Sequence, residues 1–201
     1  MESIWKKTCD SEKRPALKDH IQAEAVVIGA GMTGILTAWQ LEQAGVRTVV
    51  LEADRIGSGQ TGNTTAKITL QHGMFCSALI EKKGEETARK YVQANHAAVE
   101  EYKRIVREEK IDCDLTERDA CVYSGDREKL RRETEAARKL GIEAFLKEQI
   151  ELPVSCAGAV CVPGQVQFHP LKFVRALSER LNVYEDTRVT EVEPNLVTTA
   201  C

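Results

Sequence analysis

The part of the sequence that most constrains the fold is an apolar strand pattern that passes directly into a glycine motif. Residues 25–52 read AVVIGAGMTGILTAWQLEQAGVRTVVLE, with Gly29, Gly31 and Gly34 in the spacing GxGxxG. An amphipathic helix pattern follows, then a glycine turn and a second apolar run that ends at Glu52. In a βαβ unit, the first glycine permits the tight turn, the second lets the main chain approach a pyrophosphate, and the third lets the helix pack on the sheet. The order therefore predicts a Rossmann-like α/β fold.

The same segment indicates which dinucleotide it would bind. The start of the predicted helix would offer unpaired N–H groups and a positive dipole end to a diphosphate. Glu52 lies 18 residues after Gly34, where a carboxylate can accept hydrogen bonds from a ribose and would repel a 2′-phosphate. We therefore expect FAD or NAD rather than NADP. The alternative is a glycine-rich turn in an ordinary βαβ unit.

Composition and charge exclude several classes of partner. The chain has 201 residues, of which 42% are hydrophobic and 29% charged, as is usual for a globular protein. A formal net charge of −3 does not favour nucleic acid or an anionic membrane surface. The N-terminal segment lacks the apolar centre of a signal peptide, and no run of about 18 apolar residues occurs. We expect a cytoplasmic protein with a small-molecule substrate and without a nucleic-acid or membrane partner.

The cysteines form no recognisable metal or disulfide pattern. There are seven, and none belongs to a CxxC pair. We therefore predict no metal site and no disulfide framework, and we expect free thiols in a reducing compartment. The seven are Cys9, Cys76, Cys113, Cys121, Cys156, Cys161 and Cys201.

The rest of the chain departs from a simple doubly wound pattern. A long helical pattern covers residues 84–110, and further patterns predict a helix at 127–140, a strand closed by a turn at Pro163, and a helix at 171–181. Apolar and polar residues alternate in residues 182–193, which predicts a pair of strands. Either such late segments complete the parallel sheet, or the chain is part of a longer protein. We expect an N-terminal arm at 1–22, an incomplete FAD-binding domain at 23–83 and 155–201, and a helical excursion with part of a substrate domain at 84–154.

A second glycine-rich segment follows the strand that ends at Glu52. Residues 58–67 read SGQTGNTTAK, in which threonine hydroxyls can donate to phosphate, Gly62 can adopt a positive φ, and Lys67 can supply charge. Composition alone favours a solvated loop. Its position next to the predicted ribose-binding strand instead favours a role in the same binding site.

The glycine motif and the threonine-rich segment together resemble a known family. The stretch from VVIGAGMTG to GNTTAKIT looks like the start of the FAD-dependent oxidoreductases of the D-amino-acid oxidase superfamily. It is most similar to the branch whose longer members carry a C-terminal Rieske domain, on the basis of Ser3, Ile4 and Trp5 and the segments TGNTTAKIT and QHG. Members are about twice as long, so the chain resembles an N-terminal portion.

The resemblance implies a fold and a set of cofactor contacts. The fold is an FAD/NAD(P)-binding Rossmann-like domain of the glutathione-reductase type with part of a mixed-sheet substrate domain. FAD would lie extended, with its adenosine near Glu52 and a main-chain contact to adenine near Val189. The implied cofactor-binding residues are Gly29, Gly31, Met32, Thr33, Gly34, Glu52, Ala53, Thr61, Gly62, Thr64, Thr65, Ala66, Lys67 and Val189.

The function that follows is oxidation by a flavin. We expect hydride transfer to FAD from a C–N bond of an amine or amino acid, or from a similar bond. No catalytic residue is assigned, because His72, the one candidate near the loop, fits an ordinary structural histidine better. Two alternatives stay open: an NAD-binding dehydrogenase, and a truncated nucleotide-binding module without catalysis.

Overall fold

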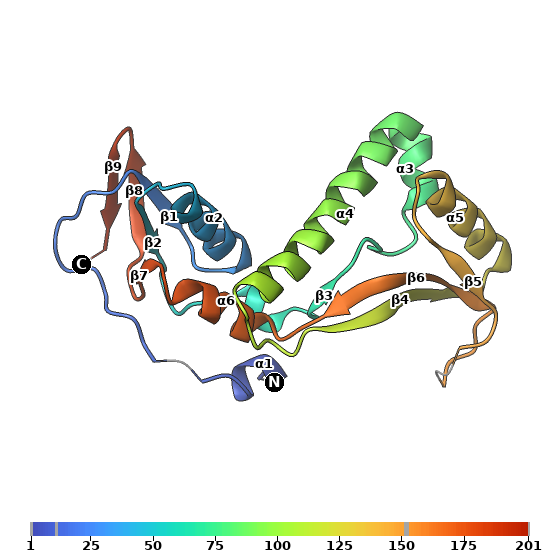
Figure 1. Ribbon diagram of the computed structural model, residues 1–201, viewed down its shortest axis with the longest axis horizontal. Helices are drawn as coiled ribbons and strands as arrows, with labels where there is room; N and C mark the ends of the chain where they lie inside the picture. Colours follow the sequence, from blue (N-terminus) through green and yellow to red (C-terminus); the bar gives the residue numbers. More distant parts are fainter. Residues whose placement is uncertain (1, 11, 151–152, 201) are drawn as a thin grey trace. The chain divides into compact units, whose positions relative to one another are not determined.

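The structure, a computed structural model, describes residues 2–10, 12–150 and 153–200 (Figure 1). The predicted free thiol of Cys201 lies outside these residues. The chain divides into two compact units, which are described separately below. The first comprises Met1–Ala66, Ile111–Cys113 and His169–Cys201, and the second comprises Lys67–Lys110 and Asp114–Phe168.

A parallel three-stranded sheet, in the order β1–β2–β7, forms the centre of the first unit. Its strands are β1 (Ala25–Ile28), β2 (Thr48–Leu51) and β7 (Asn182–Tyr184). The helix α2 (Met32–Gln43) joins β1 to β2, which is the crossover that parallel pairing requires. All four residues of β2 are buried, as expected for the apolar strand at the centre of a parallel sheet. Pairing of β7 with β2 shows that a late segment of the chain adds a strand to this sheet.

The remaining elements of the first unit surround the glycine motif. The helix α6 (Pro170–Ser178) begins with a proline in its first turn and packs against α2, with Phe173 and Val174 fully buried. The helix α1 (Ile4–Lys7) and the 3₁₀ helix η1 (Gln60–Asn63) both lie against α6. The strands β8 (Val189–Glu193) and β9 (Leu196–Thr199) form an antiparallel pair.

An antiparallel sheet with flanking helices forms the second unit (Figure 1). The strand order is β3–β6–β4, and β5 also pairs with β6. The helix α5 packs against β6, and α3 packs against α4 and α5. The elements are β3 (Lys67–Ile68), α3 (Cys76–Lys83), α4 (Glu85–Glu108), β4 (Thr116–Ser124), α5 (Arg127–Lys139), β5 (Phe145–Lys147) and β6 (Gly158–Gln167).

Two strand predictions need correction. We expected a strand to end in a turn at Pro163, but β6 continues to Gln167, because a register shift opposite β4 between Arg118 and Ala120 accommodates the proline. We also expected residues 182–193 to form a strand pair. They instead contribute β7 and β8 to two different sheets.

The expectation that all cysteines are free thiols was wrong for one pair. Cys121 on β4 and Cys161 on β6 form a disulfide, with their Cα atoms 4.1 Å apart. They lie directly opposite each other in the antiparallel register, which brings together two residues separated by 40 positions. Cys9, Cys76 and Cys156 are free thiols, as predicted.

The unit boundaries also differ from the predicted division. Residues 67–83 and 155–168, which we assigned to the FAD-binding domain, belong to the second unit because β3 and β6 pair in its sheet. Residues 1–22, predicted as a separate arm, group with the first unit.

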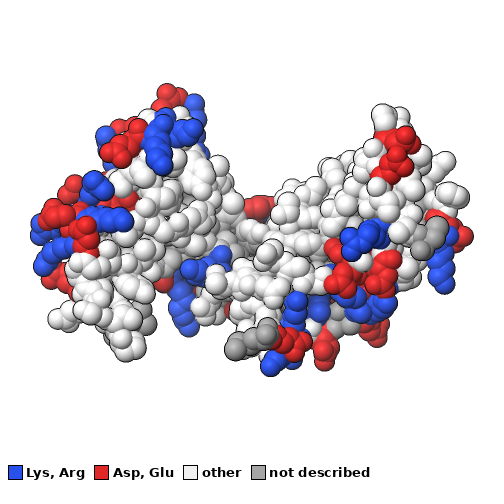
Figure 2. Space-filling view, turned by 180° about the vertical axis from the view of Figure 1, so that it is seen from behind, with Lys and Arg blue, Asp and Glu red and all other residues white. Residues whose placement is uncertain are grey.

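Figure 2 shows patches in which charged side chains of both signs lie close together, separated by wide uncharged areas. On α4, the ion pairs Arg89–Glu85 and Lys90–Glu86 each join residues one helical turn apart. Among the helices that the structure describes, none is both long and apolar enough to cross a membrane.

Candidate cofactor-binding site

The glycine turn has the backbone geometry that its sequence predicts. Gly29 has a φ of +97°, a conformation that side chains rarely adopt, and its N–H donates to the carbonyl of Leu51 at 2.8 Å. A Cβ added to Gly34 would collide with the carbonyl oxygen of Gly29. The first glycine thus permits the turn, and the third permits close packing of α2 on β1.

The start of α2 offers donors in the position expected for a diphosphate. Helix geometry leaves the first N–H groups without an acceptor inside the helix. The N–H of Met32 donates to the hydroxyl of Thr61 at 2.8 Å. The next two, of Thr33 and Gly34, donate to no atom of the residues that the structure describes. Gly31, at the N-cap, has only Thr61 within 4 Å of an added Cβ, so the main chain stays open to close approach.

Glu52 lies between this turn and the next loop. One carboxylate oxygen accepts from the N–H of Ala30 at 2.6 Å, and the other accepts from the N–H of Asp54 at 2.9 Å. Each carboxylate oxygen has a second lone pair, which can accept from a ribose hydroxyl. Ala53, half-buried, separates Glu52 from Asp54. The donors at α2 and this acceptor together fit the diphosphate and ribose of an adenine dinucleotide.

The threonine-rich segment is attached to the glycine turn. The N–H of Gly57 donates to the carbonyl of Ala30 at 3.0 Å, and η1 then brings Thr61 to the start of α2. The positive φ predicted for Gly62 occurs instead at Gly57, at +71°. Gly62 is needed for space, because an added Cβ would lie 2.7 Å from the carbonyl oxygen of Gly57.

The end of this segment is arranged locally. The hydroxyl of Thr64 accepts from the N–H of Ala66 at 3.2 Å, while the side chain of Thr65 is exposed. Ala66 is buried and has a φ of +56°, which is uncommon for a residue with a Cβ. Lys67 is exposed and begins β3 in the second unit, so its predicted cofactor contact stays a prediction.

The return from β7 runs beside Glu52. The N–H of Thr187 donates to the carbonyl of Glu52 at 2.8 Å, and the N–H of Asp186 donates to the carbonyl of Asp54 at 3.1 Å. Val189 begins β8 two residues later. The first unit therefore brings the strand that begins at Val189 close to the end of β2.

Sequence reasoning missed the contacts of the N-terminal arm. The hydroxyl of Ser3 donates to the carbonyl of Gly62, and the indole N–H of Trp5 donates to the carbonyl of Thr64 at 2.8 Å. The Trp5 ring also contacts the ring of His169, with centroids 5.0 Å apart. The arm therefore holds the threonine-rich loop, which composition alone does not indicate.

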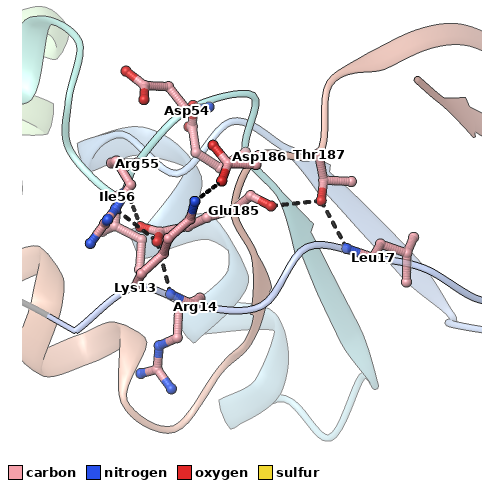
Figure 3. A network of polar contacts seen from close by, with 10 residues as sticks. Lys13, Arg14, Leu17, Asp54, Arg55, Ile56, Glu185, Asp186 and Thr187 are labelled. Atoms are coloured by element: carbon pink, nitrogen blue, oxygen red, sulfur yellow. Dashed lines mark hydrogen bonds and ion pairs between the residues drawn. The ribbon is translucent and has the colours of Figure 1, made fainter. Parts of the chain in front are cut away.

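A buried carboxylate was also missed. Glu185, after β7, is only 1% exposed and accepts from the main-chain N–H groups of Ile56 at 2.7 Å and Arg14 at 2.9 Å. It also pairs with Arg55 at 2.9 Å. Figure 3 shows this network, which joins the arm, the loop after β2 and the loop after β7.

Two of the histidines, His72 and His169, have structural partners. His169 is buried and caps α6, where its Nδ1 accepts from the N–H of Lys172 at 3.3 Å. His72, in the second unit, contacts the Tyr91 hydroxyl at 3.2 Å and the ring of Phe75. Among the described residues, no group of three or more histidine, cysteine or acidic residues could hold a metal ion.

Comparisons with known proteins agree with this fold. A family model described as FAD dependent oxidoreductase matches residues 24–200. The putative Rieske 2Fe-2S iron-sulfur protein YhfW of Bacillus subtilis is 37% identical, over 98% of this chain and 41% of that protein. Gamma-glutamylputrescine oxidoreductase of Escherichia coli is 28% identical, over 92% of this chain and 47% of that protein. The crystal structure of L-proline dehydrogenase from P. horikoshii superposes with a TM-score of 0.68 at 20% identity, over 91% of this chain and 48% of that one.

These matches confirm the resemblance to the branch with Rieske-bearing members, and the chain spans less than half the length of each of these three proteins. Because the family model covers most of the chain and the fold agrees over a similar length, the protein belongs to the FAD-dependent oxidoreductase family.

Proposed function

We propose that this chain provides the FAD-binding portion of an enzyme that oxidises a C–N bond of an amine or amino acid. The strongest support is that one unit contains the unpaired N–H groups at the start of α2, the Thr61 hydroxyl and the Glu52 carboxylate. Donors fit a diphosphate and a carboxylate fits a ribose that carries no 2′-phosphate. Family membership favours FAD over NAD as the dinucleotide.

Each part of the chain would have a distinct task. The N–H groups of Thr33 and Gly34 would bind the pyrophosphate, and Glu52 would orient the adenosine ribose. Thr61 would fix the loop against the start of α2, and Val189 would offer its main chain to adenine. FAD, when bound, supplies the acceptor for a hydride from the substrate.

The proposed substrate class comes from the relatives. Two of them are, by name, an oxidoreductase of gamma-glutamylputrescine and a dehydrogenase of L-proline. Both names refer to a substrate that contains a C–N bond. The formal charge of −3 and the mixed charges in Figure 2 support a small molecule rather than nucleic acid as the partner.

The test is the visible absorption spectrum of the purified protein, followed by acid release of any chromophore. We expect flavin bands, and we expect the released compound to be FAD. Anaerobic addition of amines and amino acids should then bleach those bands with at least one substrate of this class. A colourless protein that binds NAD instead would refute the proposal, as would a flavin that no amine or amino acid reduces.

A further inference from the structure

Residues 3–10 and 12–17 of the N-terminal arm contact two separate segments of the first unit. Its first part bonds the loop that contains Thr61, and its second part bonds the loop that follows β7. The arm and both segments belong to the same compact unit. These contacts connect the arm to Gly62 and Thr64, which follow Thr61, and to Glu185 and Thr187 in the loop after β7.

The first part of the arm fixes the direction of peptide groups in the threonine-rich loop. Ser3 and Trp5 donate to the carbonyls of Gly62 and Thr64. In a trans peptide, the carbonyl and the following N–H point in opposite directions. The N–H of Thr65, which follows the bonded Thr64 carbonyl, is therefore held pointing away from the indole of Trp5. The aliphatic part of the Lys6 side chain packs against Gly62. A Cβ added to Gly62 would lie 2.8 Å from the Cε atom of Lys6.

The second part of the arm is fixed by a buried carboxylate (Figure 3). Glu185 accepts from the N–H of Arg14 and from that of Ile56, and its own N–H donates to the carbonyl of Pro15 at 3.2 Å. The N–H of Leu17 donates to the hydroxyl of Thr187 at 3.0 Å. Because a buried charge is costly unless it is bonded, Glu185 strongly favours the state in which the arm is docked.

Thr187 and its neighbour also hold the main chain of the proposed ribose site. The N–H of Thr187 bonds the carbonyl of Glu52, and the N–H of Asp186 bonds the carbonyl of Asp54. Lys13 pairs with the side chain of Asp186. The arm therefore supports the main chain of Glu52 indirectly, because Asp186 and Thr187 contact both the arm and the residues at Glu52.

We propose that the arm is a positioning element of the cofactor site, and that docking of its residues 3–10 and 12–17 is coupled to FAD binding. This inference rests on the proposed function. Coupling of two equilibria is reciprocal, so an arm that improves FAD binding must itself be stabilised by FAD. Trp5 and Glu185 are positioning residues, because each acts through loops that carry the proposed contacts.

Two measurements test the coupling. The first is the dissociation constant of FAD, followed by flavin fluorescence, for the protein and for Trp5→Phe, which removes one indole N–H and keeps an aromatic ring beside His169. We expect about fivefold weaker binding, the effect of one neutral hydrogen bond. The second is hydrogen exchange of residues 4–17, which FAD should slow in the unaltered chain.

Matched controls separate positioning from general stability. Trp39→Phe removes buried ring volume and breaks no hydrogen bond of the described residues, so the lost packing should lower the unfolding temperature without weakening FAD binding. Lys7→Ala alters an exposed side chain of the arm and should change neither quantity.

The proposal is overturned if Trp5→Phe binds FAD as tightly as the unaltered chain, or if FAD leaves exchange in the arm unchanged. The exchange measurement needs no variant, so misfolding of Trp5→Phe would not leave the question open. If the unaltered chain binds no FAD, the proposed function fails together with this inference. If the chain binds FAD and only the coupling is absent, the proposed function stands.

Discussion

Replacement of Glu52 by glutamine tests the proposed site at its one carboxylate. Both oxygens of Glu52 accept main-chain hydrogen bonds, from Ala30 at 2.6 Å and from Asp54 at 2.9 Å. A glutamine offers one acceptor oxygen and an NH₂ group. One of the two N–H groups therefore loses its acceptor and faces another donor.

The size of the effect follows from these two bonds. A hydrogen bond to a charged group contributes about 1.5–3 kcal/mol, so the unfolding free energy of the cofactor-free protein should fall by about 2 kcal/mol. Ribose hydroxyls would then meet a neutral amide, to which hydrogen bonds are roughly half as strong. We expect a loss of about 1.4 kcal/mol in binding, which is a tenfold rise in the dissociation constant of FAD.

The assays are urea unfolding followed by circular dichroism and titration of the cofactor-free protein with FAD. Glu42→Gln is the matched control, since Glu42 lies in the same unit and accepts one main-chain bond, from Thr48 at 2.6 Å. Its glutamine keeps that acceptor, so stability should fall by less than about 1 kcal/mol and FAD binding should not change. Equal FAD affinity in Glu52→Gln and Glu42→Gln would refute the assignment of Glu52 to the ribose.

Three further changes have defined outcomes. Gly34→Ala should abolish FAD binding in a titration, because the new Cβ collides with a carbonyl of the glycine turn; unaltered affinity would contradict the close packing. Burial, followed by the charge and hydrogen bond of Glu133, raises the pKa of the Cys76 thiol to about 12, so Cys76 should resist alkylation at pH 8. Glu133→Gln removes the negative charge, lowers that pKa and should speed alkylation, as measured by mass spectrometry; an unchanged rate would contradict the role of Glu133. Reduction of the Cys121–Cys161 disulfide should lower the unfolding free energy by up to about 4 kcal/mol, the chain-entropy value for a loop of this length. An unchanged midpoint of urea unfolding after reduction would show that this disulfide does not stabilise the fold.

Local sequence was sufficient to predict the βαβ unit. The glycine spacing predicts a tight turn at Gly29 and a close approach at Gly34, and the structure has both. The helical pattern at residues 84–110 likewise predicted α4, on which Val92, Val99 and Ile105 are buried. In each case the relevant neighbours lie within a few residues or follow a regular period.

Features that depend on distant partners could not be predicted. The disulfide depends on the register of β4 against β6, which no local pattern specifies. Glu185 reads as an ordinary surface acid, yet it is buried because its partners are main-chain N–H groups at Arg14 and Ile56. The two compact units differ from the predicted domains because β6 pairs with β3, a segment about 100 residues earlier.

The most direct test of the central claim is a calorimetric titration of the cofactor-free protein with FAD and, separately, with NADP. The account predicts one FAD bound per chain and no binding of NADP, because its 2′-phosphate would meet the carboxylate of Glu52. Binding of NADP, or of NAD without FAD, would contradict it.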